Sequence, residues 1–192
     1  MKITPNSFFD GDFYKINLNV YLSNGGFKDC QKPEVAQRLI NKLGRLTWGG
    51  YGENRKDIFQ NSYLAKTGNF YHLGVDINVP KGTPVKAPFD CEVLQAWPDP
   101  DTDIGWGGRV ILKASDWLPL LVLGHLHPKK LPFCRAYKQG EVLGEVGTWP
   151  LNGNTFEHLH VQCIKHNKFD KFDGYGSLAQ LRHNPDPMEV DF

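Results

Sequence analysis

The stretch HLGVDINVPKGTPVKAPFDCEV, residues 72–93, decides the fold class of this chain. Short runs of β-forming residues are separated in it by proline, glycine and aspartate, which favour turns. Similar runs follow at GGRVILKA (107–114), LPLLVLGHLH (118–127) and HLHVQCIK (158–165). The intervals are too short for crossover helices, so neighbouring strands should pair mainly antiparallel. The sequence therefore predicts a mostly β fold.

The first 69 residues have a different pattern. In KPEVAQRLINKLGRL (32–46) apolar residues recur at helical spacing after Pro33, and Gly44 can end the helix. We expect one helix here, over about residues 33–44. The run from Tyr14 to Tyr21 could form an edge strand, and the glycine-rich TWGGYGENR (47–55) reads as a loop.

These patterns indicate three parts in one α+β chain. We expect residues 1–69 to form an N-terminal extension that packs on a core over residues 70–170. Residues 171–192, which are polar and interrupted by proline, should form a C-terminal tail. A length of 192 residues suits one domain with such an appendage.

The charge balance and the apolar content argue against two classes of partner. With 22 basic and 21 acidic residues the formal charge is +1, so no strong field attracts nucleic acid or acidic lipid. No apolar stretch approaches the length of a membrane span, and the first residues lack the apolar segment of a signal peptide. We expect no nucleic-acid partner, no integral membrane segment and synthesis as a cytoplasmic protein.

The cysteines do not form a recognisable metal or redox motif. Cys30, Cys91, Cys134 and Cys163 are far apart and include no C-x-x-C pair, which argues against a zinc ribbon and a thioredoxin-like site. Cys91 and Cys163 lie in strand-like runs, where a buried free thiol is the expected state. A disulfide stays open as the alternative.

Five of the seven histidines occur in three short contexts, HLGVD, GHLH and EHLHVQ. In a strand, residues i and i+2 point to the same face, so His158 and His160 should project into one groove. Alone, such a pair is either part of a metal site or a solvent-facing pair. His72 and Asp76 reach one metal only if the backbone bends between them, and Gly74 would permit the bend. Otherwise they are an exposed turn histidine and an aspartate at a strand end.

Taken together, these residue types are chemically coherent. Two neutral imidazoles and one carboxylate form the ligand set of a catalytic zinc site with an open fourth position. Further histidines nearby could carry protons or stabilise an oxyanion. The chain has more histidines than one metal needs, which favours a catalytic site over a structural one.

The order of the motifs resembles a known family. HLGVDINVPKGTPVKAPFDCEV, LGHLH and VLGEVGTWPLNGNTFEHLHVQ are similar to the conserved segments of lysostaphin-type (LytM-like) zinc metalloendopeptidases, which cleave peptidoglycan peptides. The resemblance covers roughly residues 70–165. It implies an antiparallel sheet with a groove over it and one Zn²⁺ per chain. The implied metal ligands are His72, Asp76 and His160, and the implied catalytic residues are His125 and His158.

The chain departs from the family pattern at two places beside these motifs. Cys91 stands where the family has glycine, and Glu157 stands where it has a small residue or proline. We expect Glu157, together with Tyr51 and Arg55 of the 47–55 segment, to contact substrate. His127 has no counterpart in the pattern and is interpreted as a loop residue.

Two functions follow from the resemblance. The first is hydrolysis of a peptide bond in peptidoglycan stem peptides or cross-bridges by zinc-activated water, with action outside the cytoplasm. The alternative is a catalytically idle member that acts as a binding or regulatory module for a partner protein or a cell-wall glycan. A cupin-like metal site is excluded, because no glutamate follows the His125 and His127 pair at the short spacing required.

Overall fold

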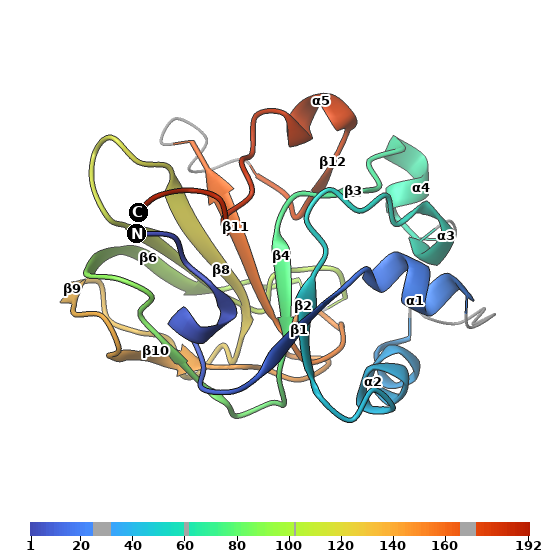
Figure 1. Cartoon of the computed structure of the whole chain (residues 1–192), viewed down its shortest axis with the longest axis horizontal. Helices are drawn as coiled ribbons and strands as arrows, with labels where there is room; N and C mark the ends of the chain where they lie inside the picture. The colour runs from blue at the N-terminus through green and yellow to red at the C-terminus, as the bar shows by residue number, and fades with distance from the viewer. Residues whose placement is uncertain (25–31, 60–61, 102, 166–171) are drawn as a thin grey trace.

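An eight-stranded sheet forms the centre of the molecule in this computed structural model, which describes residues 1–24, 32–59, 62–101, 103–165 and 172–192 (Figure 1). The strand order is β1-β2-β4-β11-β8-β7-β6-β9. Its members are β1 (Phe13–Ile16), β2 (Leu46–Gly49), β4 (Val75–Asn78), β6 (Cys91–Pro98), β7 (Gly108–Lys113), β8 (Leu120–Leu126), β9 (Ala136–Tyr137) and β11 (Leu159–Ile164). All neighbouring pairs are antiparallel except β1 and β2, which are parallel. The mostly β, largely antiparallel prediction is confirmed.

Two small sheets flank the large one. β5 (Pro84–Lys86) pairs with β10 (Val142–Glu145), and β3 (Tyr71–His72) pairs with β12 (Tyr175–Gly176). The second pair ties the segment before β4 to the C-terminal tail, so the predicted tail contributes a strand beside His72.

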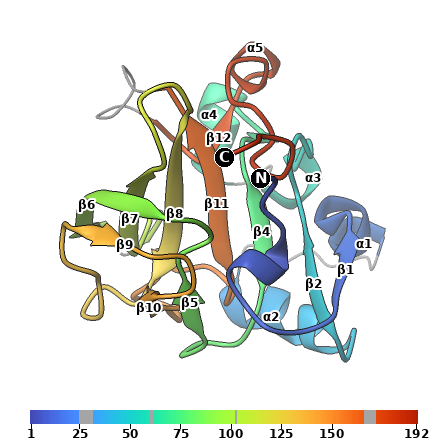
Figure 2. The ribbon, with the colours of Figure 1, turned by 60° about the vertical axis from the view of Figure 1, so that its left-hand side comes forward.

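Alternation along the strands separates two faces of the large sheet. In β8, Leu121 and Leu123 enter the main core, while Leu120 and Val122 belong to a smaller cluster on the other face. Figure 2 shows β8, β11 and β4 side by side, and the same alternation holds in all three. In β11, Leu159, Val161 and Cys163 enter the main core, so the residues between them face the opposite side. In β4, Val75 and Ile77 do the same.

The N-terminal 69 residues depart from the prediction of a single helix. Their described part contains a 3₁₀ turn (Pro5–Ser7) and four α-helices, α1 (Leu18–Asn24), α2 (Pro33–Asn41), α3 (Lys56–Phe59) and α4 (Leu64–Thr67). α2 begins at Pro33 as predicted and ends three residues before the expected limit. The other three helices are too short for a helical period to be visible in the sequence. Helices of this length are stabilised mainly by packing and not by their own propensity.

The structure also changes the bounds of the predicted edge strand and of the predicted loop. Of the proposed edge strand from Tyr14 to Tyr21, only residues 14–16 are extended, as part of β1 at the edge of the sheet, and α1 begins at Leu18. The first residues of TWGGYGENR form β2 and not a loop, because they pair with β4, with Thr47 opposite Asn78 and Gly49 opposite Asp76. Two strands of the N-terminal segment are thus part of the same sheet as the core.

The chain ends and cysteines complete the fold. The N-terminal amine donates to the Phe192 carbonyl oxygen at 2.7 Å, so the two termini lie side by side (Figure 1). The last helix is α5 (Leu178–Leu181). Cys91 and Cys163 are free and buried, as predicted, and Cys134 is free and exposed; Cys30 lies outside the described residues. Within the described chain no helix is long and apolar enough to cross a membrane.

Candidate metal centre

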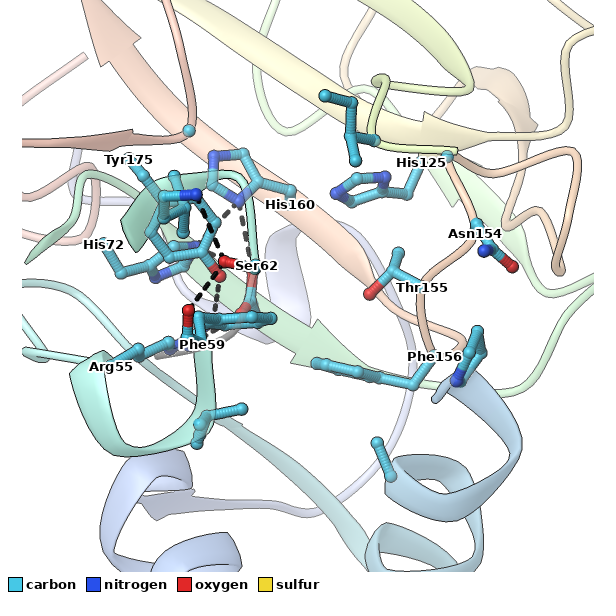
Figure 3. Close-up of a pocket in the computed structure, with 18 of the residues that line it drawn as sticks. Arg55, Phe59, Ser62, His72, His125, Asn154, Thr155, Phe156, His160 and Tyr175 are labelled. Carbon is cyan, nitrogen blue, oxygen red and sulfur yellow. Dashed lines mark hydrogen bonds and ion pairs between the residues drawn. The ribbon is translucent and has the colours of Figure 1, made fainter. Parts of the chain in front are cut away.

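One carboxylate oxygen lies at the centre of the histidine cluster. Asp76 Oδ1 is 3.3 Å from His72 Nε2, 3.1 Å from His160 Nδ1 and 3.3 Å from His158 Nε2. His72 Nε2 and His160 Nδ1 are themselves 3.1 Å apart. All four residues are buried. The structure thus brings together the three predicted metal ligands and one of the two predicted catalytic histidines (Figure 3).

The backbone reaches this arrangement through a break between β3 and β4. His72 ends β3 and Asp76 lies in β4. The chain bends at Leu73 and Gly74, which separate the two strands, as predicted from Gly74. A Cβ at Gly74 would lie 2.6 Å from the His160 ring, so the close approach needs glycine. His160 in β11 is directly opposite Asp76 on one side and Gly124 of β8 on the other.

The far ring nitrogen of each histidine faces an oxygen acceptor. The four contacts are His72 Nδ1 to Gly50 O at 3.1 Å, His160 Nε2 to Gln162 Oε1 at 3.0 Å, His158 Nδ1 to Phe156 O at 2.9 Å and His125 Nδ1 to Asn152 O at 2.7 Å. A carbonyl oxygen only accepts, so each of these nitrogens must carry the proton. The Gln162 orientation agrees, because its amide nitrogen donates to the Asp173 carbonyl oxygen at 3.1 Å.

This tautomer pattern leaves lone pairs facing one another. His72 Nε2 and His160 Nδ1 then hold no proton between them, and the Asp76 carboxylate adds a negative charge beside both. Such a cluster is favourable only around a cation. A tetrahedral zinc site with Zn–N bonds of about 2.0–2.1 Å separates its ligand atoms by about 3.3–3.4 Å. The observed separations of 3.1–3.3 Å fit this value, and oxygen acceptors behind the ligating imidazoles are the usual outer partners of such a site.

Burial and the nearby guanidinium of Arg55 set the protonation states of His72 and Asp76 that a bound cation requires. Burial, reinforced by the positive charge of Arg55, lowers the pKa of His72 to about 3, so this imidazole is neutral at pH 7. Burial alone would raise the pKa of Asp76, but the positive charge around it, which includes the Arg55 guanidinium, outweighs burial and holds the pKa well below its ordinary range. Asp76 is therefore ionised.

Arg55 lines the cavity at the metal centre and contacts the second oxygen of Asp76. Its Nη2 donates to Asp76 Oδ2 at 2.8 Å, its Nε donates to Glu53 Oε2 at 3.1 Å and its Nη1 donates to the Tyr175 hydroxyl at 3.0 Å. The guanidinium thereby occupies one oxygen of Asp76 and leaves the other facing the histidines. The side chain is 2% exposed and pairs with the Asp76 carboxylate, so its predicted contact with substrate stays a prediction. Glu53 in turn accepts from the backbone N–H of Leu18 at the start of α1, at 2.8 Å.

Two further predicted substrate contacts lie elsewhere. The Tyr51 hydroxyl donates to the carbonyl oxygen of Asn184 at 2.7 Å, and its ring packs against the main core. Glu157 accepts from the Thr148 hydroxyl at 3.0 Å and from the Lys81 backbone N–H at 3.1 Å. Neither residue lines the cavity described next. The polar atoms of both side chains already have hydrogen-bond partners within the fold, and these contacts link separate loops.

A cavity of about 290 Å³ opens onto the cluster. His125 lines it, half-buried, with its ring centroid 4.5 Å from that of His158. The backbone of His125 has φ 63°, a conformation that non-glycine residues rarely adopt outside functional sites. Trp106 lies beside both His125 and His160, stacked on the first at 6.3 Å and edge-on to the second at 5.2 Å. His127 does not line the cavity, and its Nδ1 accepts from the Lys129 backbone N–H.

Several residues of the site were missed by sequence reasoning. Gln162 had a usable signal, because it lies two residues after His160 in EHLHVQ and so shares its strand face. The acceptors at Gly50, Asn152 and Phe156 are backbone carbonyls, which have no side-chain signal.

Comparisons with known proteins identify the family to which the sequence is similar. A sequence model of peptidase family M23 matches residues 70–185. No curated protein matches the chain. Among solved structures, the chain is similar to the catalytic domain of the antimicrobial peptidase lysostaphin from Staphylococcus simulans, with 25% identity and a TM-score of 0.45 over 62% of this chain and 77% of that one.

Two other solved structures show a similar degree of likeness. A catalytic-domain mutant of a prophage-encoded M23 protein from Enterococcus faecalis is 23% identical, with a TM-score of 0.44 over 61% of this chain and 76% of that one. A zinc-containing peptidase from Vibrio cholerae is 20% identical, with a TM-score of 0.46 over 64% of this chain and 31% of that one.

Proposed function

The chain belongs to peptidase family M23, and from this premise we propose that it is a zinc-dependent endopeptidase that hydrolyses a peptide bond in peptidoglycan stem peptides or cross-bridges. One observation carries the proposal. Lone pairs of His72 and His160 converge with the Asp76 carboxylate at 3.1–3.3 Å, and acceptors behind each ring hold that tautomer.

We assign the zinc ion to His72 Nε2, Asp76 Oδ1 and His160 Nδ1. His158 Nε2 is as close to Asp76 as His72 is, so distance alone does not choose between them. The assignment rests on the motif order of the family and on the mutual proximity of these three ligand atoms. Zinc in such a site polarises a carbonyl group and lowers the pKa of a water molecule.

His125 and His158 are the proposed catalytic residues. Each donates through Nδ1 to a backbone carbonyl, which leaves Nε2 free to accept a proton. Burial, reinforced by the neighbouring His158 and His160, lowers the pKa of His125 well below its ordinary value, so it starts the cycle as a base. One of the pair can take a proton from the attacking water and return it to the leaving amine, while the other donates to the oxyanion once protonated.

The substrate class places the activity outside the cytoplasm. Peptidoglycan peptides are extracytoplasmic, so export or delivery of the chain is part of the proposal. Nucleic acid is not among the proposed partners, given a formal charge of +1.

Digestion of purified peptidoglycan, with mass analysis of the fragments, tests the proposal. We expect new amine termini in the presence of zinc, none after removal of the metal by a chelator, and recovery on re-addition of zinc. His125→Ala should abolish cleavage. His127→Ala is the matched control, because this histidine is two residues away and outside the cavity, and it should cleave like the parent protein.

Zinc content tests the assignment of roles. His72→Ala and Asp76→Ala should bind less than stoichiometric zinc, whereas His158→Ala should keep zinc and lose cleavage. Stoichiometric zinc in both ligand variants would overturn the ligand assignment. A zinc-loaded parent protein that binds peptidoglycan and releases no fragment would favour the idle binding module.

A further inference from the structure

The cavity extends from the histidines toward the N-terminal helices, where its wall becomes apolar. Six apolar residues form this wall: Leu18 and Leu22 of α1, Ala36 of α2, Ile58 and Phe59 of α3, and Phe156. Figure 3 shows Phe59 and Phe156 on the side of the cavity away from His125 and His160, with helical segments beyond them. Five of the six come from before residue 70, outside the region that the family model matches. This wall is therefore an addition to the shared core.

The apolar wall begins at the catalytic pair itself. Phe156 stacks on the His158 ring, with a centroid separation of 4.3 Å and an interplanar angle of 28°. The same phenylalanine belongs to a hydrophobic cluster with Leu22, Ala36 and Ile58. A peptide whose scissile bond lies between His125 and His158 thus has one neighbouring side chain directed along this wall.

The charged groups around this part of the cavity are already engaged. Arg55 is paired with Glu53 and Asp76, and Glu53 also accepts from the start of α1. The helix side of the cavity therefore offers an apolar surface, whereas Asp103, Asp173 and other polar residues line the rest of its about 290 Å³. A glycine residue would leave the apolar side unfilled.

We propose that α1, α2 and α3 build a specificity pocket for a large apolar side chain on a residue beside the scissile bond. This proposal rests on the peptidase chemistry of the proposed function and goes beyond its substrate, because peptidoglycan stem peptides and cross-bridges carry small or charged side chains. It names a second class of substrate, peptides with a large apolar residue, for the same site. Peptides with leucine or phenylalanine at that position should be cleaved at least about tenfold more efficiently than the glycine peptide, because the missing methylenes of glycine forgo contacts in an apolar pocket.

A library of short capped peptides tests the pocket. Glycine, alanine, leucine or phenylalanine occupies each position in turn, and kcat/KM is measured for zinc-loaded protein. Leu22→Ala enlarges the pocket and should shift the preference toward phenylalanine by at least about fivefold. Leu39→Ala is the matched control, because it removes the same atoms from the same cluster, and Leu39 does not line the cavity. It should leave the preference unchanged.

A second variant and a binding measurement separate the two proposals. Ala36→Met fills the pocket and should lower kcat/KM for leucine and phenylalanine peptides while sparing the glycine peptide. Calorimetry with the His125→Ala protein measures binding of the same peptides without cleavage.

If no peptide is hydrolysed, yet apolar peptides bind and Ala36→Met abolishes the binding, the pocket stands and the peptidase proposal fails. If glycine peptides are cleaved as well as leucine peptides, and Leu22→Ala matches Leu39→Ala, the pocket proposal is overturned.

Discussion

Replacing Arg55 with methionine removes the guanidinium group that donates to Asp76 Oδ2 at 2.8 Å, while the Asp76 carboxylate stays buried. The change also removes the donors to Glu53 and to the Tyr175 hydroxyl. Removing one partner of a buried ion pair typically costs about 3–5 kcal/mol, because the other charge is left without compensation. We expect the free energy of unfolding of the metal-free protein to fall by about this amount.

Arg135→Met is the matched control. Arg135 pairs with Glu141 at 3.1 Å, but the two side chains are 52% and 40% exposed. Water screens this pair, so its loss should leave the free energy of unfolding almost unchanged. The difference between the two variants therefore isolates the effect of burial beside the metal centre.

Urea unfolding followed by tryptophan fluorescence measures both variants, first without metal and then with saturating zinc. Zinc bound at Asp76 would supply positive charge where the guanidinium is missing. We therefore expect zinc to stabilise Arg55→Met more than it stabilises the parent protein. A loss in Arg55→Met no larger than that in Arg135→Met would refute the reasoning. Equal stabilisation by zinc in the parent and in Arg55→Met would refute the charge argument.

Three other predictions concern residues that are not proposed to bind the metal. Gln162→Leu removes the acceptor for His160 Nε2 and should weaken zinc binding by about 10–100-fold in competition with a chelating dye, whereas Gln162→Glu should retain most of the affinity. Burial raises the pKa of the Cys163 thiol to about 12, so iodoacetamide near about pH 8 should modify exposed Cys134 and spare Cys163 until denaturant is added, as read by peptide mass mapping. Burial also raises the pKa of Asp186, so its stabilising contribution is present at low pH and is lost as pH rises through the folded-state pKa. Urea unfolding should therefore show Asp186→Asn gaining stability relative to the parent from about pH 3 to about pH 7, and a constant difference would contradict this.

The strand pattern and the main histidine cluster were predictable from local sequence. Alternation in β8 and β11 sets which residues enter the core, and it also sets the face on which His160 and Gln162 lie. Gly74 signalled the bend that brings His72 to Asp76. Helices α1, α3 and α4 were not predictable, because segments of four to seven residues have too few periodic positions.

Local sequence determines which side chains share one face of a strand, because side-chain direction in a strand has a fixed period of two. It therefore predicts which imidazoles and carboxylates lie on the same face. Tertiary structure alone decides what surrounds them. Arg55 contacts Asp76 across 21 residues of sequence, and a backbone carbonyl at Gly50 orients His72 across 22. No pattern in a linear sequence records such contacts, since they depend on how separate segments pack. The types of ligand at the site follow from residue identity. The tautomer of His72, the guanidinium beside Asp76 and most of the apolar wall of the cavity follow from the packing of residues 1–69 against the core.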